Sequence, residues 1–374
     1  MKKILLGTSA LVLFAGAAAA QQVTTKAPFT VTLGGSIRSD FIIVNDDLAN
    51  QESREARIDY RLTVKAEAKA ENGLVYGFSG RLRNNQGSSG VNPGQTNQDV
   101  VGMDEKWVYM GGSWGQVQLG DAYAADTRLA VRAPTVGIGQ ADYAFGTVTG
   151  NYRWVHLNEG EVDTKISYMS PVFAGFQAGI SYTPEMNSHG RDNARSKFVT
   201  GADNKYSDLI SIGASYAGSF SDIGVKLGGG VQFGDAKDTS ATVKSTLGDY
   251  SVWHVGAQVS YAGFTVGGHY SDASDSMRTK GDELSHWQLG LSYAVGPWAV
   301  AANYSRTETD FGARNTKDAT DYMWGVGGAY QLAPGLSLQA DVAFFEIESP
   351  VSGLKSGQTK NDGTLFTFRT RVDF

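Results

Sequence analysis

The sequence has no cysteine among its 374 residues and only 8 prolines. Without cysteine, the chain has neither disulfides, nor thiolate metal sites, nor the lipid-modified cysteine of a lipoprotein. Beyond the first 20 residues, no apolar run reaches the roughly 18 residues that a membrane-spanning helix needs. The formal net charge of −6 is mildly acidic, which argues against a nucleic-acid partner. If this chain resides in a membrane, strands must therefore cross it.

The first 20 residues predict an export signal. Lys2 and Lys3 precede an apolar run over residues 4–16, and small residues follow as far as Ala20. This run is too short to span a bilayer as a helix, and its basic start and small-residue end are features that signal peptidase recognises. We expect residues 1–20 to be a signal peptide and residues 21–374 to form a single domain.

The rest of the chain has a period of two, which is typical of strands. Over residues 56–71, polar residues such as Arg57, Asp59 and Arg61 alternate with apolar residues such as Ile58 and Tyr60. A strand places these two sets on opposite faces, whereas a helix would scatter the charges around its axis. The alternation recurs, less cleanly, to the end of the chain. It predicts a sheet with one apolar face and one polar face.

Short turns alternate with long polar loops. Tight turns fall at Asn72 and Gly73 and at Ala262 and Gly263, whereas residues 86–99 and 186–203 form long loops. This pattern is typical of an outer-membrane barrel, with the short turns at the periplasmic end.

The segments between turns and loops predict an all-β fold, a transmembrane antiparallel barrel of 16 strands. An even count places both termini on the periplasmic side, so a seventeenth strand at residues 152–156 is disfavoured. The predicted strands cover residues 29–44, 54–71, 74–86, 100–113, 115–121, 161–172, 175–184, 206–217, 221–233, 249–261, 264–273, 283–295, 297–307, 321–332, 335–348 and 363–374.

Three segments carry a resemblance to a known family. They are the chain end TFRTRVDF over residues 367–374, YMSPVFAGF over residues 168–176, and WGQVQLG over residues 114–120. In combination they resemble the Gram-negative general diffusion porins, most closely the alphaproteobacterial type, along essentially the whole mature chain. The resemblance implies a water-filled outer-membrane channel for passive diffusion of small hydrophilic solutes and ions. It also implies that the final residue, Phe374, acts as an assembly signal.

The resemblance also implies partners and a constriction. Family members are homotrimers embedded in outer-membrane lipid and lipopolysaccharide, and the barrel assembly machinery inserts them. The loop after the fifth strand, here about residues 122–160, folds into the barrel and narrows the pore.

In such pores, acidic residues of the loop oppose basic residues of the wall. The expected basic wall is Arg38, Arg57, Arg61, Arg81, Arg83, Arg369 and Arg371. The expected loop acids are Asp121, Asp126 and Asp142, although Arg128, Arg132 and Arg153 in the same stretch oppose their charge. The charge preference of the pore therefore stays open at this point.

Other functions remain as alternatives. Aromatic residues in the loop would suit a solute-selective channel, for example one for sugars, or would anchor the loop; they are Tyr123, Tyr143, Phe145, Tyr152 and Trp154. An outer-membrane adhesin or a barrel enzyme is an alternative from a different class. The run from Gly111 to Gly115 matches a nucleophile pattern around Ser113, but that pattern requires a following helix, and a strand is predicted here. We expect no enzyme activity, cofactor or metal.

Overall fold

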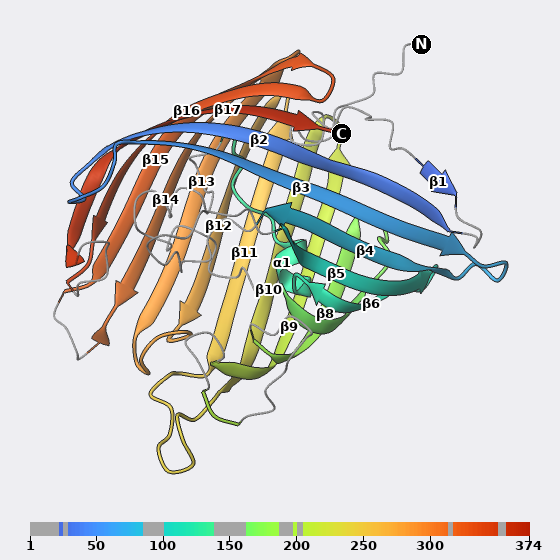
Figure 1. The fold of residues 1–374 in the computed structure, drawn as a ribbon, viewed down its shortest axis with the longest axis horizontal. Coiled ribbons are helices and arrows are strands. Elements are labelled where there is room, and N and C mark those ends of the chain that lie inside the picture. Colours follow the sequence, from blue (N-terminus) through green and yellow to red (C-terminus); the bar gives the residue numbers. More distant parts are fainter. Residues whose placement is uncertain are drawn as a thin grey trace.

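The computed structural model describes residues 22–24, 29–84, 101–137, 162–186, 197–199, 205–312, 317–350 and 357–374. Strands β2 to β17 each pair antiparallel with their neighbours in sequence, and β17 pairs with β2. This last pairing closes the sheet into a barrel (Figure 1). The predicted fold class, a closed barrel of 16 antiparallel strands, is confirmed.

The strands lie close to their predicted positions, and β1 is an addition to them. The elements are β1 (Gln22–Thr24), β2 (Thr30–Asp46), β3 (Arg54–Lys69), β4 (Val75–Asn84), β5 (Val101–Gly112), β6 (Gly115–Ala122), α1 (Ala125–Leu129), β7 (Asp163–Met169), β8 (Phe176–Glu185), β9 (Tyr206–Phe220), β10 (Ile223–Ala236), β11 (Tyr250–Tyr261), β12 (Phe264–Ser274), β13 (Glu283–Val295), β14 (Trp298–Asp310), β15 (Ala319–Ala333), β16 (Leu336–Glu348) and β17 (Lys360–Asp373). The predicted signal peptide and the disfavoured strand at residues 152–156 lie outside the described residues.

Strand β9 continues three residues beyond its predicted end at residue 217. Gly218 lies within the strand and does not begin a turn. A side chain there would collide with the ring of Tyr216, whose hydroxyl lies 2.2 Å from the Cβ position. The turn follows at Ser221, which has a positive φ of 52°. Glycine at this position therefore makes room for an aromatic ring within the strand.

The chain termini meet at the closing pair of strands. β1 pairs with the start of β2, on the edge that β17 leaves open. The backbone N–H of Gly35 donates to the carbonyl of Phe374 at 2.8 Å, and the N–H of Phe374 donates back at 3.1 Å. The last residue of the chain thus completes the hydrogen bonding of the closing strand.

The barrel reverses the burial pattern of a soluble protein. Outward-facing apolar residues are exposed; Leu289 on β13, for example, is 56% exposed. Its inward-facing neighbour Gln288 is only 3% exposed. Such a surface is stable when lipid covers the outside and water fills the inside. Among the described residues, no helix is long and apolar enough to cross a membrane.

Aromatic pairs border the apolar outer face. Near the short turns, the rings of Phe264 and Tyr293 lie 4.4 Å apart. Toward the long-loop ends, those of Trp287 and Tyr304 lie 4.9 Å apart. Aromatic residues favour the two membrane interfaces, because their rings are apolar but tolerate water. The apolar band between these two levels marks the part of the barrel that faces lipid.

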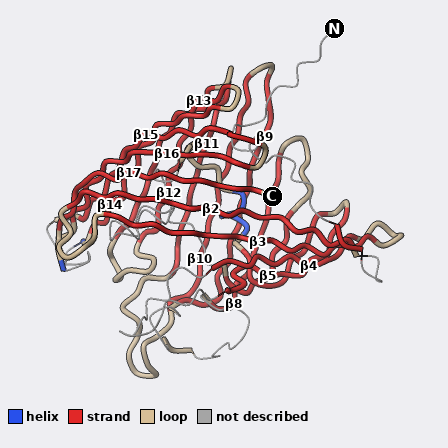
Figure 2. Tube along the Cα trace, turned by 45° about the horizontal axis from the view of Figure 1, so that its top comes forward, coloured by secondary structure: helices blue, strands red, loops and turns tan. Residues whose placement is uncertain are grey.

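The described part of the loop after β6 runs along the inner wall. Helix α1 lies inside the barrel against β8, β9 and β10, as Figure 2 shows. Inward-facing glycines allow this close approach. A Cβ added at Gly256 would lie 1.7 Å from the carbonyl oxygen of Val131, and one at Gly230 would lie 2.4 Å from Cβ of Asp126. These glycines create the space that the loop backbone occupies.

The inward face is not polar throughout, which corrects the simple alternation expected from the sequence. Near the long loops, apolar side chains from β2, from the residues just after it and from β15, β16 and β17 form a buried cluster inside the barrel. Its members are Ile42, Val44, Leu48, Met323, Ala343, Phe345, Ile347 and Leu365. These side chains pack against one another and therefore do not face water.

Replacement of Leu289 by lysine tests which face meets lipid. We expect Leu289→Lys to destabilise the barrel in lipid vesicles by about 2 kcal/mol, because it places a charge in the apolar band. Thr63→Glu serves as the control and should cost much less, because it places a charge on the inward face of β3, opposite Arg81. Urea unfolding followed by tryptophan fluorescence measures both. Equal losses would contradict the assignment of the faces.

Replacement of Gly256 by alanine tests the contact between loop and wall. The added methyl group collides with the Val131 carbonyl, so we expect Gly256→Ala to cost about 1–3 kcal/mol of unfolding free energy. The matched control is Gly224→Ala, whose Cβ lies 3.6 Å from its nearest neighbour, Ser260. An undiminished stability of Gly256→Ala would show that the loop does not press against this strand.

Candidate functional site

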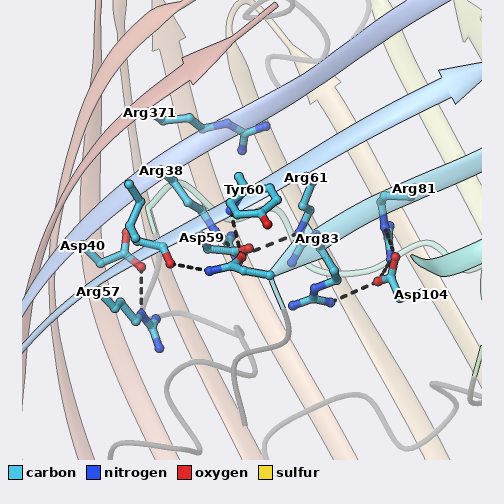
Figure 3. Close-up of polar contacts among 12 residues, drawn as sticks. Arg38, Asp40, Arg57, Asp59, Tyr60, Arg61, Arg81, Arg83, Asp104 and Arg371 are labelled. Carbon is cyan, nitrogen blue, oxygen red and sulfur yellow. Dashed lines mark hydrogen bonds and ion pairs between the residues drawn. The ribbon is translucent and has the colours of Figure 1, made fainter. Parts of the chain in front are cut away.

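The predicted basic residues lie together on one side of the lumen. We call Arg38, Arg57, Arg61, Arg81, Arg83, Arg369 and Arg371 the arginine wall. They come from the adjacent strands β17, β2, β3 and β4 (Figure 3). The closing pair of strands brings residues from the two ends of the chain together, since Arg369 pairs in register with Asp40 and Arg371 with Arg38. Barrel closure therefore assembles the wall.

Asp40 is enclosed by two arginines of the wall. It pairs in register with Arg369 on one side and Arg57 on the other. Arg369 Nη2 donates to Asp40 Oδ2 at 2.8 Å, and Arg57 Nε donates to the same oxygen at 3.0 Å. All three side chains are largely withdrawn from the lumen water. These three side chains therefore link β2 to β17 and to β3, and they contribute little to the surface that a solute contacts.

Asp59 likewise bonds an arginine of the neighbouring strand. Arg38 Nε donates to Asp59 Oδ2 at 2.8 Å, directly across the β2–β3 junction. On the other side of Arg38 lies Arg371, which has the same charge, and Arg371 Nη2 instead bonds Asp373 two residues along its own strand at 2.7 Å. Most arginines of the arginine wall thus bond carboxylates on the same or neighbouring strands.

A second group of carboxylates lies on β5. Arg81 Nε donates to Asp104 Oδ1 at 2.9 Å, and its Nη1 lies 2.6 Å from Glu105 Oε1. Arg83 Nη1 reaches Asp104 Oδ2 at 3.3 Å. An irregularity in the β4–β5 register lies at this point, and both acids of β5 contact Arg81 there. Asp104 therefore serves two arginines at once.

Arg61 is the least compensated member of the wall. It pairs in register with Arg83, and like charges placed directly opposite repel. Its nearest carboxylate oxygen, Asp59 Oδ2, is 3.8 Å from its Nε, and that Nε has no hydrogen-bond partner. The side chain is 38% exposed. Arg61 is therefore the member of the arginine wall whose positive charge is most available to the lumen.

On the opposite side, polar side chains of the wall bind the loop backbone. Ser181 Oγ accepts from the N–H of Ala125 at 2.9 Å, and Asn303 Nδ2 donates to the carbonyl of Pro134 at 2.7 Å. Between them, Gln258 Nε2 donates to the carbonyl of Arg132 at 2.8 Å. The loop is thus attached across the inner faces of β8 to β14.

Asp126 of α1 faces this wall and not the lumen. Its carboxylate accepts from Gln232 Nε2 at 2.7 and 2.9 Å and lies 3.5 Å from His254 Nε2. Asp126 is 0% exposed. The predicted opposition of this loop acid to the arginine wall is therefore corrected: the carboxylate anchors the loop.

Arg128 of α1 does face the lumen. Its side chain is exposed, its Nη1 donates to Gln118 Oε1, and its guanidinium carbon lies 5.6 Å from the ring centre of Trp107. Glu105 of the wall interacts electrostatically with both Arg128 and Arg61. The described face of the loop thus presents a cation toward a wall that is itself basic.

Asp121 was expected to oppose the arginine wall but faces away from the lumen, which is a second correction. It lies in β6 with the same parity as the outward-facing Leu119, and only 1% of it is exposed. Its carboxylate bonds Lys106 of β5 and Thr164 of β7. A glycine with positive φ, Gly120, precedes it. The result is an ion pair on the outer side of the barrel.

Of the remaining residues predicted to line the constriction, the structure describes one. Tyr123 follows β6 and is half-buried. Asp142, Tyr143, Phe145, Tyr152 and Trp154 lie outside the described residues, as does the rest of the predicted constriction loop from residue 138 to 160.

Two patterns that suggest chemistry have structural explanations. Ser113 lies in the tight turn that joins β5 to β6. The fold brings His254 and His269 together, with 3.4 Å between His269 Nε2 and His254 Nδ1, on the wall behind the loop. Within the described ranges, no group of side chains has the composition of a metal site.

Sequence reasoning missed the carboxylates that pair with the wall. Asp104 and Glu105 were not singled out, although they stand in the strand next to Arg81 and Arg83. The only available signal was a run of charge in β5, and the register that places it opposite the arginines is a property of the folded sheet. For Asp40 and Asp59, the alternation identified their face but not their partners.

The sequence matches the model of the Gram-negative porin family over residues 7–349. Two uncharacterized proteins of Rickettsia are relatives. The one from Rickettsia bellii is 24% identical over 335 residues, covering 71% of this chain and 75% of that protein. The protein RT0064 of Rickettsia typhi is 21% identical over 458 residues, covering 100% of both chains.

Solved structures of outer-membrane proteins share the fold. An anion-selective porin from Comamonas acidovorans aligns with a TM-score of 0.63 and 18% identity, covering 92% of this chain and all of that one. The trimer form of OmpT, an outer-membrane protein of Vibrio cholerae, aligns with a TM-score of 0.59 and 13% identity, covering 92% of this chain and 99% of that one. The family match, the closed barrel and its inward-facing polar wall agree. The chain belongs to the Gram-negative porin family and forms an outer-membrane porin channel.

Proposed function

We propose that this porin lets small hydrophilic solutes and ions diffuse passively, and that its lumen favours anions over cations. The observation that carries the charge preference is the orientation of Asp126 and Arg128 on α1. The acid is buried against the wall, whereas the arginine is exposed to the lumen. The side chain of Arg61 on β3 is 38% exposed, and its closest carboxylate oxygen, on Asp59, is 3.8 Å away. Exposed cations in one lumen lower the energy of an anion that passes through it.

The carboxylates of the lumen oppose this preference only weakly. Asp40 and Asp59 are buried and bonded to arginines of the wall, and Asp104 serves both Arg81 and Arg83. Each such carboxylate is largely neutralised by its partner before a solute arrives. The mildly acidic composition of the whole chain therefore does not determine the sign of the charge that a permeating ion meets.

We propose no catalytic step and no cofactor. Diffusion through a water-filled barrel requires only a lined passage, and the histidines and glutamines behind the loop have a structural use there. The signal peptide over residues 1–20 and assembly through Phe374 remain predictions from the sequence.

We also propose a homotrimer, which the outward-facing ion pair of Lys106 and Asp121 supports. Asp121 lies six residues along β6 from Gly115. In a strand tilted by about 40° this separation is roughly 15 Å, within an apolar band about 25 Å tall. An ion pair at that height is costly against lipid chains, and contact with a second subunit removes it from lipid. The trimer form of the similar Vibrio cholerae protein agrees with this proposal.

The reversal potential of single channels in a salt gradient tests the charge preference. We expect the wild type to favour chloride over potassium. Arg61→Gln and Arg128→Gln should each lower the permeability ratio about twofold, because each removes one exposed cation from the lumen.

The matched control for this measurement is Arg306→Gln, an outward-facing arginine on β14. It should leave the ratio unchanged. A wild-type preference for potassium would contradict the anion proposal, and absence of any conductance would contradict the channel itself.

The thermal stability of the oligomer in detergent tests the trimer. Lys106→Met leaves the Asp121 carboxylate buried without its cation, which costs about 3–5 kcal/mol, so we expect the oligomer to dissociate at a lower temperature. The double variant Lys106→Met with Asp121→Leu removes both charges and should recover most of this stability. If the native protein migrates as a monomer, the trimer proposal is wrong.

A further inference from the structure

A cavity of about 670 Å³ lies at the short-turn end of the lumen, beneath α1. Inward-facing residues of β3, β6 and β8 line it, together with α1 and the β5–β6 turn. Its polar side chains include Lys69, Ser113, Gln116, Gln118, Arg128 and Gln177. Its volume is within the range of cavities that hold small organic ligands. Since short turns face the periplasm, this cavity opens on the periplasmic side of the channel.

The charge of the cavity has one sign. Lys69 comes from β3 and Arg128 from α1, and no carboxylate stands among the described residues that line the cavity. Neither cation forms an ion pair with a carboxylate in the described part of the chain. This differs from the arginine wall, where Asp40, Asp59 and Asp104 each bond arginines. Two cations on one cavity, neither of them in an ion pair with a described carboxylate, favour an anionic occupant.

Hydrogen bonds orient the cation of α1. Arg128 Nη1 donates to Gln118 Oε1, and Gln118 Nε2 donates in turn to Gln116 Oε1. Because a guanidinium can only donate, this direction is fixed. The Nε2 amide hydrogens of Gln116, at the end of this series, have no acceptor among the described residues. Arg128 also packs over the ring of Trp107, with 5.6 Å between the guanidinium carbon and the ring centre. The donors are thus held in place before a ligand arrives, which lowers the entropic cost of binding.

We propose that this cavity is a binding subsite for a small hydroxylated organic anion on its way through the channel. Lys69 and Arg128 bind its carboxylate or phosphate group, and the Gln116 amide donates to that group or to a hydroxyl. Gln177 and Ser113 meet further hydroxyls. The inference rests on the proposed channel function, because the solute reaches the cavity through the lumen.

Single-channel recording with gluconate tests the subsite. The protein is inserted into a planar bilayer in potassium chloride, and gluconate is added to one side and then to the other. We expect gluconate to interrupt the current at lower concentration from the short-turn side, and glucose at equal concentration to interrupt it far less. Lys69→Gln and Arg128→Gln should each raise the half-blocking concentration about tenfold, since each removes a charge-assisted bond.

The matched control is Lys226→Gln. Lys226 also faces inward near a short turn, on β10, but does not line the cavity. It should leave the half-blocking concentration unchanged. Gln116→Leu removes the free amide donor without a change of charge and should weaken the block by a smaller factor, which separates donor geometry from charge.

The outcomes separate the two proposals. Potassium chloride conductance without gluconate block would overturn the subsite and leave the channel function standing. Equal weakening by Lys226→Gln and Lys69→Gln would also overturn the subsite, because general rim charge would then explain the block. Block by inorganic phosphate as strong as that by gluconate would overturn the role of the hydroxyls. Heat-modified electrophoretic mobility confirms that each variant is folded.

Discussion

Backbone hydrogen bonding within the bilayer is the constraint on which the rest of this structure depends. Each N–H and C=O at the level of the lipid chains must find a partner in the protein, because no water reaches it. The sheet meets this requirement by pairing β17 with β2, so that no edge remains. The same pairing places Arg369 beside Asp40 and Arg371 beside Arg38. Closure of the barrel and assembly of its charged wall are thus one event.

The two sides of the lumen serve different purposes. On the arginine side, nearby carboxylates neutralise most of the cations, and Arg61, whose side chain is 38% exposed, has only a 3.8 Å contact with a carboxylate. On the other side, serine, glutamine and asparagine side chains bind the loop, and inward-facing glycines give its backbone space. The buried carboxylate of Asp126 belongs to this attachment. On the exposed face of α1 stands Arg128. A solute that passes α1 therefore meets a positive charge.

Much of the fold could be predicted from the sequence, because strand periodicity is a local property. The alternation over residues 56–71 identified both faces of β3, and turn residues such as Ala262 and Gly263 fixed where strands reverse. The failures were also local in origin. Gly218 resembles a turn residue but makes room for the Tyr216 ring, and Asp121 resembles an acid of the constriction but faces away from the lumen. A single glycine or aspartate does not carry enough local information to separate such cases.

The sequence by itself determined the barrel, its strand number, the parity of each face and the positions of the seven wall arginines. The tertiary structure alone decided which charges are neutralised. Asp104 bonds Arg81, and Asp40 bonds Arg369 across a separation of 329 residues. It also decided that Asp126 is buried while Arg128, two residues later, is exposed. The physical reason is that alternation depends on neighbouring residues, whereas an ion pair depends on register between strands and on the path of a loop, which only the closed barrel defines.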